Sequence, residues 1–425
     1  MDRGLKKTID WYLVGSYLIL VLIGWINIYA SIQSSEPASI FDINYRCGMQ
    51  FIWILVAVAM AVVVIFAVNP RLWEVISTPS YIVVLALLVA VIFLGTEHKG
   101  SHSWFTFGPV SFQPAEISKI TTSLMLAMYM SQAGFKMDSG RQMLQVALIA
   151  GLPMLTIIAE QETGSALVYI GFLFCLYREG LSGWYLFYLA AAIFLFILTI
   201  KTSVLVSLVV LAVGIVIYLI ASRRQLEQIR TRRKCIIRAI ACLVAGAALI
   251  FSTEFAFNTI LHDYQRLRIE VLLGIKDDPS GVGYNVRQSM IAIGSGGIFG
   301  KGFLNGTQTA YGFVPEQSTD FIFCTVGEEW GFLGCLVVIL LYIFLIWRII
   351  KDADESREAF TRIYGYCVAG CLFMHLFINI GMTIGLMPVI GIPLPLMSYG
   401  GSSLLTFTLL IFIFIALNRQ EKKYF

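Results

Sequence analysis

Charged residues are scarce in this chain of 425 residues. Asp, Glu, Lys and Arg together make up 13% of it, whereas hydrophobic residues make up 58%. Apolar runs of about 18 residues or more recur along the chain, and in a soluble globule so much apolar surface would have no water-free partner. The composition therefore excludes a soluble fold and predicts a polytopic membrane protein built from helices.

Cysteine is almost absent from the predicted outside loops, and histidine is rare throughout. Of the eight cysteines only Cys47 lies in such a loop, so we expect no disulfide. The four histidines lack the spacing typical of zinc ligands, which argues against a structural metal site. We expect the basic loop 223–238 to act as a topological anchor near anionic membrane lipids. Because no nucleic-acid motif accompanies it, we expect no nucleic-acid partner.

Twelve apolar runs predict membrane spans, several of them short. They lie near 11–32, 50–68, 80–95, 117–133, 143–159, 164–177, 184–200, 203–222, 239–255, 330–347, 363–385 and 396–417. The first run is long enough to cross, so we expect it to be retained rather than cleaved as a signal. Most Lys and Arg residues then fall on the side of the two termini, which predicts that both termini are cytoplasmic.

The stretch 256–329 is the only long segment outside these spans, and on this topology it faces outward. Its glycine-rich part, 276–302, also carries apolar residues at a density that predicts packing, so we expect a re-entrant or lid-like element. The other outward segments, 99–119, 159–166 and 385–403, combine Pro or Gly with polar groups at a membrane boundary, as broken helices that line a site do. Four such segments predict one extracytoplasmic site.

Asp277 and Asp278 open the glycine-rich part. Pro279 biases Asp278 toward an extended backbone, and the following "SGVG" permits a tight turn. A carboxylate on such a turn can be held over a cavity, but a solvated Asp-Pro turn without a chemical role also fits these residues.

Glu116 and Lys119 are three residues apart at the start of a helical run, close enough to pair, and Glu162 lies at a neighbouring outward junction. Ionisable groups beside spans normally pair or face a water-filled pathway. A structural ion pair and a ligand site are both consistent with this pattern, and one pair can serve both roles.

The run "GSGGIFGKG" at 294–302 differs from a nucleotide-binding loop, because its spacing is Gly-x5-Gly-Lys and Gly302 replaces the Ser or Thr that would hold magnesium. Its amides and Lys301 can still receive a phosphate as an anion nest, although a tight turn explains the glycines equally well.

Other polar and aromatic residues allow two interpretations each. Trp104 and Phe105 can stack on a sugar ring or anchor at the membrane interface. Glu316 and Asp320 precede an apolar run, where they can contribute to a site or simply start a helix.

Together these segments resemble the SEDS family, the shape, elongation, division and sporulation proteins, from about residue 11 to the C-terminus. The resemblance rests on motifs in the family's order: "SWFTFGPVSFQPAEISK", "ETGSALV", "HDYQRLR", "DDPSGVGYNVRQSMIAIGSGGIFGKGFLNGTQ", "VPEQSTDFIFCTVGEEWGFLG" and "NIGMTIGLMPVIGIPLPLMSYGGSS". The third and fourth resemble the elongation members more than the division members. The resemblance implies one all-α membrane domain over 1–425, with 10–12 transmembrane helices in the cytoplasmic (inner) membrane.

Members of this family polymerise peptidoglycan, which implies that the substrate is lipid II and that its N-acetylmuramyl C1 is joined to the 4-hydroxyl of an N-acetylglucosamine. The family motif Asp-Pro-x-Gly-x-Gly-Tyr assigns Asp278 as the general base, a role worth ~10²–10⁴-fold in rate. Direct displacement by the hydroxyl inverts C1. The outward cations available for the pyrophosphate leaving group are Lys119, Lys301, Arg266 and Arg268. No tightly bound cofactor is implied, although a divalent cation, Mg²⁺ or Mn²⁺, can assist.

The remaining substrate-binding candidates at the matching motifs are Trp104, Gln113, Glu116, Glu162, Gln288, Ser289, Glu316, Asp320 and Ser398. The chain departs from the family at Asn285, where Gln is common, at "EQETG" in place of Gln-Pro-Asp-Leu-Gly, and at Ser103, where a basic residue is common. The family usually has ten spans, so we expect a surplus pair between about 184 and 255.

The family's partners, carried over by resemblance, are a class B penicillin-binding protein that supplies transpeptidation and the shape proteins MreC and MreD. Two alternative functions remain at this point. A lipid II flippase would need alternating access to the cytoplasm and no catalytic carboxylate. A non-catalytic scaffold of the elongation complex would tolerate loss of Asp278.

Overall fold

The computed structural model describes residues 9–32, 39–98, 101–107, 110–223, 229–261, 263–276 and 281–424. They form two compact units. Unit 1 comprises Met1–Leu181 and Tyr284–Phe425, and unit 2 comprises Ser182–Gly283. Each unit is built almost entirely from helices, which confirms the predicted all-α class.

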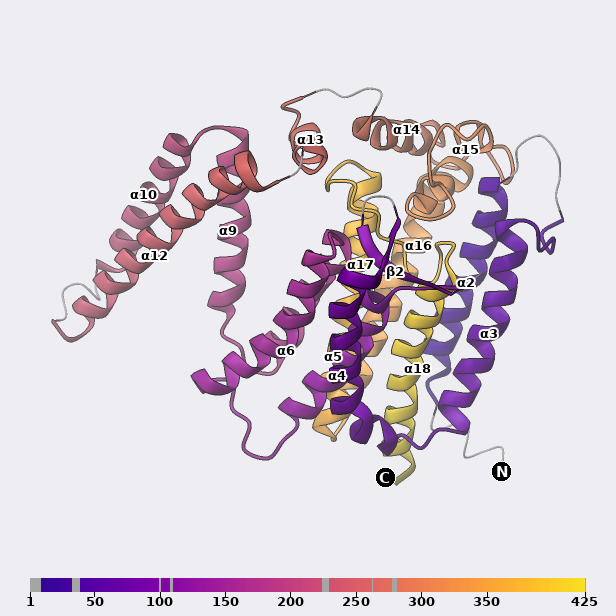
Figure 1. Cartoon of the computed structure of the whole chain (residues 1–425), viewed down its shortest axis with the longest axis horizontal. Helices are drawn as coiled ribbons and strands as arrows, with labels where there is room; N and C mark the ends of the chain where they lie inside the picture. Colours follow the sequence, from indigo (N-terminus) through magenta and orange to yellow (C-terminus); the bar gives the residue numbers. More distant parts are fainter. Residues whose placement is uncertain are drawn as a thin grey trace. The chain divides into compact units, whose positions relative to one another are not determined.

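Long apolar helices make up most of unit 1 (Figure 1). Its helices, in chain order, are α2 (Trp11–Ile32), α3 (Arg46–Phe66), α4 (Arg71–Leu94), α5 (Pro114–Met130), α6 (Gly140–Ala159), α7 (Thr163–Val168), η1 (Tyr169–Gly171), α8 (Phe172–Arg178), α14 (Val282–Ser295, of which Tyr284 onward belongs to this unit), α15 (Thr307–Ala310), α16 (Ile322–Glu355), α17 (Ala359–Thr383) and α18 (Gly401–Tyr424). Helix α17 packs against α5, α8, α16 and α18, and α18 packs against α3 and α5. Helices α17 and α18 are therefore largely buried, whereas α3, α4 and α6 expose apolar side chains.

Small residues let these helices approach closely, as is common between membrane helices. A Cβ added at Gly171 would lie 2.5 Å from the carbonyl oxygen of Gly370, and one added at Gly370 would lie 2.4 Å from that of Gly171. Elsewhere a buried hydrogen bond joins α2 to α18, where Tyr17 Oη lies 2.8 Å from Thr408 Oγ1. Both contacts hold the buried α17 and α18 in fixed positions.

The twelve predicted spans all correspond to helices in the described part of the chain. Ten of these helices are long and apolar enough to cross a membrane. The two shorter ones are α5, with 17 residues, and the helical run Thr163–Arg178. The prediction of 10–12 spanning helices is confirmed, and the position of a surplus pair stays a prediction.

Unit 2 contains α9 (Gly183–Lys201), α10 (Val204–Ala221), α12 (Ile229–Phe255), the π-helix η2 (Ala256–Ile260) and α13 (Asp263–Leu272). Helix α12 packs along both α9 and α10 (Figure 1). Because α12 begins at Ile229, much of the basic stretch predicted as the loop 223–238 is helical instead, and residues 224–228 lie outside the described residues.

A small antiparallel sheet precedes α5, and the sequence analysis did not predict it. Its strands are β1 (Thr96–His98), β2 (Ser101–Phe107) and β3 (Val110–Phe112), in the order β1-β2-β3. The start of α2 and the end of α18 lie at one end of unit 1, and α14 and α15 lie at the other (Figure 1). The latter is called the α15 end below.

Candidate functional site

The first turns of α5 bring three ionisable side chains together inside unit 1. Lys119 is fully buried, and its Nζ lies 2.8 Å from Glu116 Oε1 and 3.0 Å from His375 Nε2 on α17. The ammonium also lies 5.2 Å from the ring centroid of Phe407 on α18. The predicted pairing of Glu116 with Lys119 is confirmed.

These contacts surround the ammonium of Lys119 on three sides. A buried charge is costly unless it is paired and hydrogen-bonded, and this lysine has a carboxylate, an imidazole and an aromatic face as neighbours. It therefore joins α5, α17 and α18 in this structure. Glu116 Oε2, in contrast, is buried and has no hydrogen-bond donor among the residues that the structure describes.

The segment 384–400, between α17 and α18, has no helix and contains residues with positive φ, among them Gly391 at 74°. Asn379 fixes it from α17, because its Nδ2 donates to the carbonyl oxygens of Ile392 at 2.7 Å and Asp320 at 2.8 Å. One side chain thus links α17, this segment and the residues just before α16.

The same two segments are joined a second time at Ser398. Its Oγ donates to the carbonyl oxygen of Thr319 at 2.6 Å and accepts from the backbone N–H of Leu394 at 2.8 Å. The backbone N–H of Tyr399 also donates to the carbonyl oxygen of Ser318 at 2.8 Å. Ser398 therefore holds the backbone in place here, a role that the resemblance did not indicate.

Two glutamates lie at the junction between α6 and α7. Ser103 on β2 donates from Oγ to Glu162 Oε1 at 2.7 Å. Glu160 is 1% exposed, and within the described part of the chain neither of its carboxyl oxygens makes a hydrogen bond. Burial, with a smaller contribution from the charge of Glu162, raises the pKa of Glu160 to about 8. Sequence reasoning missed Glu160, although its position two residues from Glu162 was a usable signal.

Close approaches at two glycines bring these segments to one place. A Cβ at Gly164, in the first turn of α7, would lie 2.8 Å from the side chain of Ile392. A Cβ at Gly391 would lie 3.4 Å from Asp320 Oδ2. The junction of α6 and α7, the segment 384–400 and the start of α16 therefore meet at the α15 end of unit 1.

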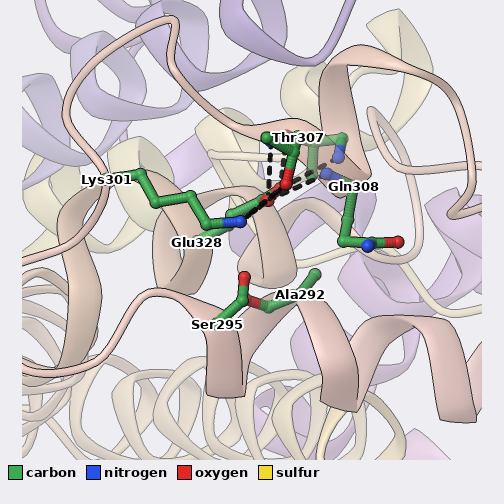
Figure 2. A network of polar contacts seen from close by, with 7 residues as sticks. Ala292, Ser295, Lys301, Thr307, Gln308 and Glu328 are labelled. Atoms are coloured by element: carbon green, nitrogen blue, oxygen red, sulfur yellow. Dashed lines mark hydrogen bonds and ion pairs between the residues drawn. The ribbon is translucent and has the colours of Figure 1, made fainter.

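A second polar cluster is built around Glu328 on α16 (Figure 2). Its Oε1 accepts from Lys301 Nζ at 2.6 Å and from the backbone N–H groups of Thr307 and Gln308 at 2.7 and 2.8 Å. Its Oε2 accepts from the N–H and the hydroxyl of Thr309 at 2.9 and 2.8 Å. The buried carboxylate thus binds the first amides of α15 and a lysine ammonium at once.

Lys301 consequently has internal partners, because its Nζ also donates to Thr307 Oγ1 at 2.7 Å. The amides of the predicted anion nest are used as well. The N–H of Gly300 donates to Gly296 O at 2.8 Å, and those of Lys301 and Gly302 donate to Glu328 O and Glu329 O at 3.0 Å. The glycine run is therefore a tight turn that pairs with α16, rather than an open anion nest.

A break in α16 makes this pairing necessary. Gly331 has φ 65° and ψ −161°, so the helical hydrogen bonds are interrupted there. The N–H groups of Phe332 and Leu333 donate instead to Gly297 O at 2.9 Å and Ile298 O at 3.1 Å. Irregular backbone at such a position is tolerated when protein groups satisfy it.

The other candidates from the sequence lie in different surroundings. Gln113 is the buried N-cap residue of α5, Ser289 Oγ donates to Thr383 O at 2.9 Å, and Trp104 and Gln288 are partly exposed. Glu316 Oε2 accepts from Thr319 Oγ1 at 3.1 Å.

Two of the four predicted cations and the predicted base are not part of these clusters. Arg266 and Arg268 belong to α13 in unit 2, where Arg266 Nε lies 3.0 Å from Glu270 Oε1. Asp278 falls in 277–280, outside the described residues. Among the residues that are described, no three His, Cys, Asp or Glu side chains are grouped as metal ligands.

Comparison with known proteins gives consistent matches over nearly the whole chain. The FtsW, RodA and SpoVE model, described as cell cycle protein, matches residues 10–231 and 230–423. The peptidoglycan glycosyltransferase MrdB of Escherichia coli (strain K12) is 34% identical over 352 residues, 82% of this chain and 80% of that protein. The peptidoglycan glycosyltransferase RodA of Treponema pallidum (strain Nichols) is 29% identical over 446 residues, 99% of each chain.

Solved structures agree with these matches. One is a chain from a study of the coordination of polymerization and crosslinking by a peptidoglycan synthase complex, with a TM-score of 0.68, 26% identity and coverage of 97% of this chain and 98% of that one. The rod shape determining protein RodA of Thermus thermophilus matches with a TM-score of 0.61 and 22% identity over 97% of both chains, which supports the fold. This chain therefore belongs to the FtsW, RodA and SpoVE family of cell cycle proteins, the SEDS family.

Proposed function

We propose that this protein is a peptidoglycan glycosyltransferase that joins lipid II disaccharide units into glycan strands for cell-wall elongation. The observation that carries the proposal is the match to relatives named peptidoglycan glycosyltransferase over more than four fifths of the chain. The convergence of the motif-bearing segments at the α15 end supports it, because a polymerase needs one site that holds both a donor and an acceptor.

Asp278 is the proposed general base. A sugar hydroxyl is a weak nucleophile, and a carboxylate that removes its proton as the bond to C1 forms lowers the barrier. The pyrophosphate leaves from the opposite face, so C1 inverts without a covalent enzyme intermediate. Lys119, Lys301, Arg266 and Arg268 remain the proposed cations for the leaving pyrophosphate, although Lys119, Lys301 and Arg266 each pair with a glutamate in this structure. A divalent cation is a further proposed source of positive charge.

The membrane position follows the positive-inside rule. We propose that both termini are cytoplasmic, that the α15 end of unit 1 faces away from the cytoplasm, and that the active site lies on the extracytoplasmic side. Affinity for lipid II should reside in its head group, since the polyprenyl tail leaves one apolar environment for another.

The opposite end of unit 1 bears on the flippase alternative, which requires that end to open. There Arg348 pairs with Asp10 and lies 3.8 Å from Asp352, which accepts from Asn418 Nδ2 at 2.8 Å. Two further pairs join α8 to α16 and α17: Arg178 with Asp354, and Arg362 with Glu179. Opening this end would separate several ion pairs that join five helical segments, which favours the polymerase over the transporter.

We propose a class B penicillin-binding protein as the crosslinking partner, because a solved relative was studied within a complex that coordinates polymerization and crosslinking. MreC and MreD remain partners proposed from family resemblance alone.

The test is polymer formation from purified lipid II, with the transpeptidase present, by the wild-type protein and the variant Asp278→Asn. Polymer from wild type and none from a folded variant that still binds lipid II supports the proposal. Normal polymer from Asp278→Asn would remove Asp278 from catalysis. A wild-type protein that moves lipid II across vesicle membranes without making polymer would favour the flippase.

A further inference from the structure

His375 is a polar residue in the middle of a buried helix. It lies in α17, is 1% exposed, and is flanked along the chain by apolar residues. Its ring packs edge-on against Phe407 of α18, with centroids 4.8 Å apart and an interplanar angle of 87°. A histidine at such a position could be only a packing residue, but both of its ring nitrogens have polar neighbours.

Those neighbours determine the protonation of the ring. Nε2 lies 3.0 Å from Lys119 Nζ, and an ammonium has only donors, so Nε2 must accept and carries no proton. Nδ1 lies 3.3 Å from the carbonyl oxygen of Pro393, which can only accept, so Nδ1 carries the proton. The ring is therefore the neutral tautomer protonated at Nδ1.

This arrangement forms a chain of hydrogen bonds between distant parts of the sequence. Glu116 accepts from Lys119, which donates to His375, which in turn donates to Pro393. The first two residues belong to α5, the third to α17 and the last to the segment 384–400. Helix α5 and that segment are thus connected through one imidazole ring.

The neighbours of the segment 384–400 relate this chain of hydrogen bonds to the candidate site. Pro393 follows Ile392, which contacts the first turn of α7 and is held by Asn379. Gly391 lies beside the carboxylate of Asp320. At the other end of the chain of hydrogen bonds, Glu116 Oε2 is a buried acceptor with no donor in the described ranges.

We propose that His375 is a positioning residue. Its neutral imidazole is hydrogen-bonded to Lys119 on one side and to the carbonyl oxygen of Pro393 on the other. These two bonds set the distance between Glu116 and the segment 384–400. The inference rests on the proposed glycosyltransferase function, because positioning is measured through that reaction. It adds a residue to which the resemblance assigned no role.

Two substitutions separate hydrogen bonding from packing. His375→Phe keeps an aromatic ring beside Phe407 but removes both nitrogens, whereas His375→Gln loses the ring but can accept from Lys119 and donate to Pro393. We expect kcat for lipid II polymerisation to fall roughly 10-fold to 100-fold in the first, because small displacements in a site cost that much, and to stay within about threefold of wild type in the second. Cys367→Ala, a buried truncation elsewhere on α17, serves as the packing control and should leave kcat unchanged.

The opposite order, with His375→Gln impaired and His375→Phe active, would overturn the proposal in favour of packing, and so would equal activity in all variants. If His375→Phe does not fold, the glutamine variant still decides, since activity below one tenth of wild type contradicts the proposal.

A spectroscopic test does not depend on activity. In protein labelled with ¹⁵N-histidine, the signals that disappear in His375→Gln should show one protonated and one unprotonated ring nitrogen between pH 6 and 8, and the selective assignment should place the proton on Nδ1. Two protonated nitrogens, or a proton on Nε2, would overturn the inference. A wild-type protein that makes no polymer would refute the proposed function, while this spectrum would still decide the hydrogen-bond chain.

Discussion

Glu160 should make the stability of this protein depend on pH in the direction opposite to that of most carboxylates. Its pKa is raised from an ordinary 4.5 to about 8, first because the carboxyl is buried and second because Glu162 is near. Below pH 4.5 the group is protonated in both the folded and the unfolded chain. As the pH rises toward 8, the unfolded chain releases the proton while the folded chain retains it, so unfolding becomes progressively more favourable.

The magnitude follows from the pKa difference. At about 1.4 kcal/mol per pKa unit, the rise from 4.5 to about 8 corresponds to roughly 5 kcal/mol of folding free energy, which is lost as the pH rises from below 4.5 to above 8. Glu160→Gln places a neutral amide at the same position and should remove most of this dependence.

The assay is thermal unfolding in detergent at pH 5, 6.5 and 8 for wild type, Glu160→Gln and the exposed control Glu355→Gln. We expect the midpoint of Glu160→Gln to exceed that of wild type by several degrees at pH 8 and by much less at pH 5. The control should follow wild type at each pH. An equal difference between Glu160→Gln and wild type at pH 5 and pH 8 would show that the carboxyl titrates alike in the folded and unfolded chains, which would refute the reasoning.

Two further predictions concern the pairing of the glycine turn with α16. Gly300→Ala should lower the free energy of unfolding by roughly 2–5 kcal/mol, because φ is +80° there and a Cβ would lie 2.0 Å from the carbonyl oxygen of Glu329; a thermal midpoint equal to that of wild type would contradict this. Glu328→Gln should lower the free energy of unfolding by roughly 3–5 kcal/mol, because it removes the negative charge to which Lys301 and three backbone amides donate. Adding Lys301→Met to this variant should then lower it little further. Full additivity of the two substitutions in a double-mutant cycle would contradict the coupling.

Helix positions were predictable because hydropathy is a local property of the sequence. Each predicted span corresponds to a helix, and α5, which has 17 residues, carries Glu116 and Lys119 in its first two turns. Spacing also predicted that these two residues pair, since three residues bring side chains to one face of a helix.

Partners brought together by the tertiary fold were not predictable in the same way. Lys301 and Glu328 are 27 residues apart, and they meet only because α16 breaks at Gly331 and the glycine turn supplies its missing hydrogen bonds. The sequence around His375 did not indicate a polar role, because a single histidine in an apolar run is usually a core residue. Its role depends on Lys119, which is 256 positions away.

Alternatives that the sequence left open at the site also depend on tertiary contacts. The sequence left an anion nest and a tight turn equally open at 294–302, and the amide hydrogen bonds to α16 decide for the turn. For Lys119 the sequence left a structural ion pair and a ligand site open, and in this structure a carboxylate, an imidazole and an aromatic ring are its neighbours. Its part in substrate binding stays a prediction. In both cases the lysine, Lys301 or Lys119, has partners within the protein that hold backbone or helices in place.

The most direct test of the central claim is glycan-strand formation from purified lipid II by the wild-type protein and Asp278→Asn, measured with the transpeptidase present. The account predicts long polymer with the wild-type protein. It predicts a loss of at least 100-fold in the folded variant, while lipid II binding is retained. Polymer formation by Asp278→Asn at the wild-type rate would contradict it.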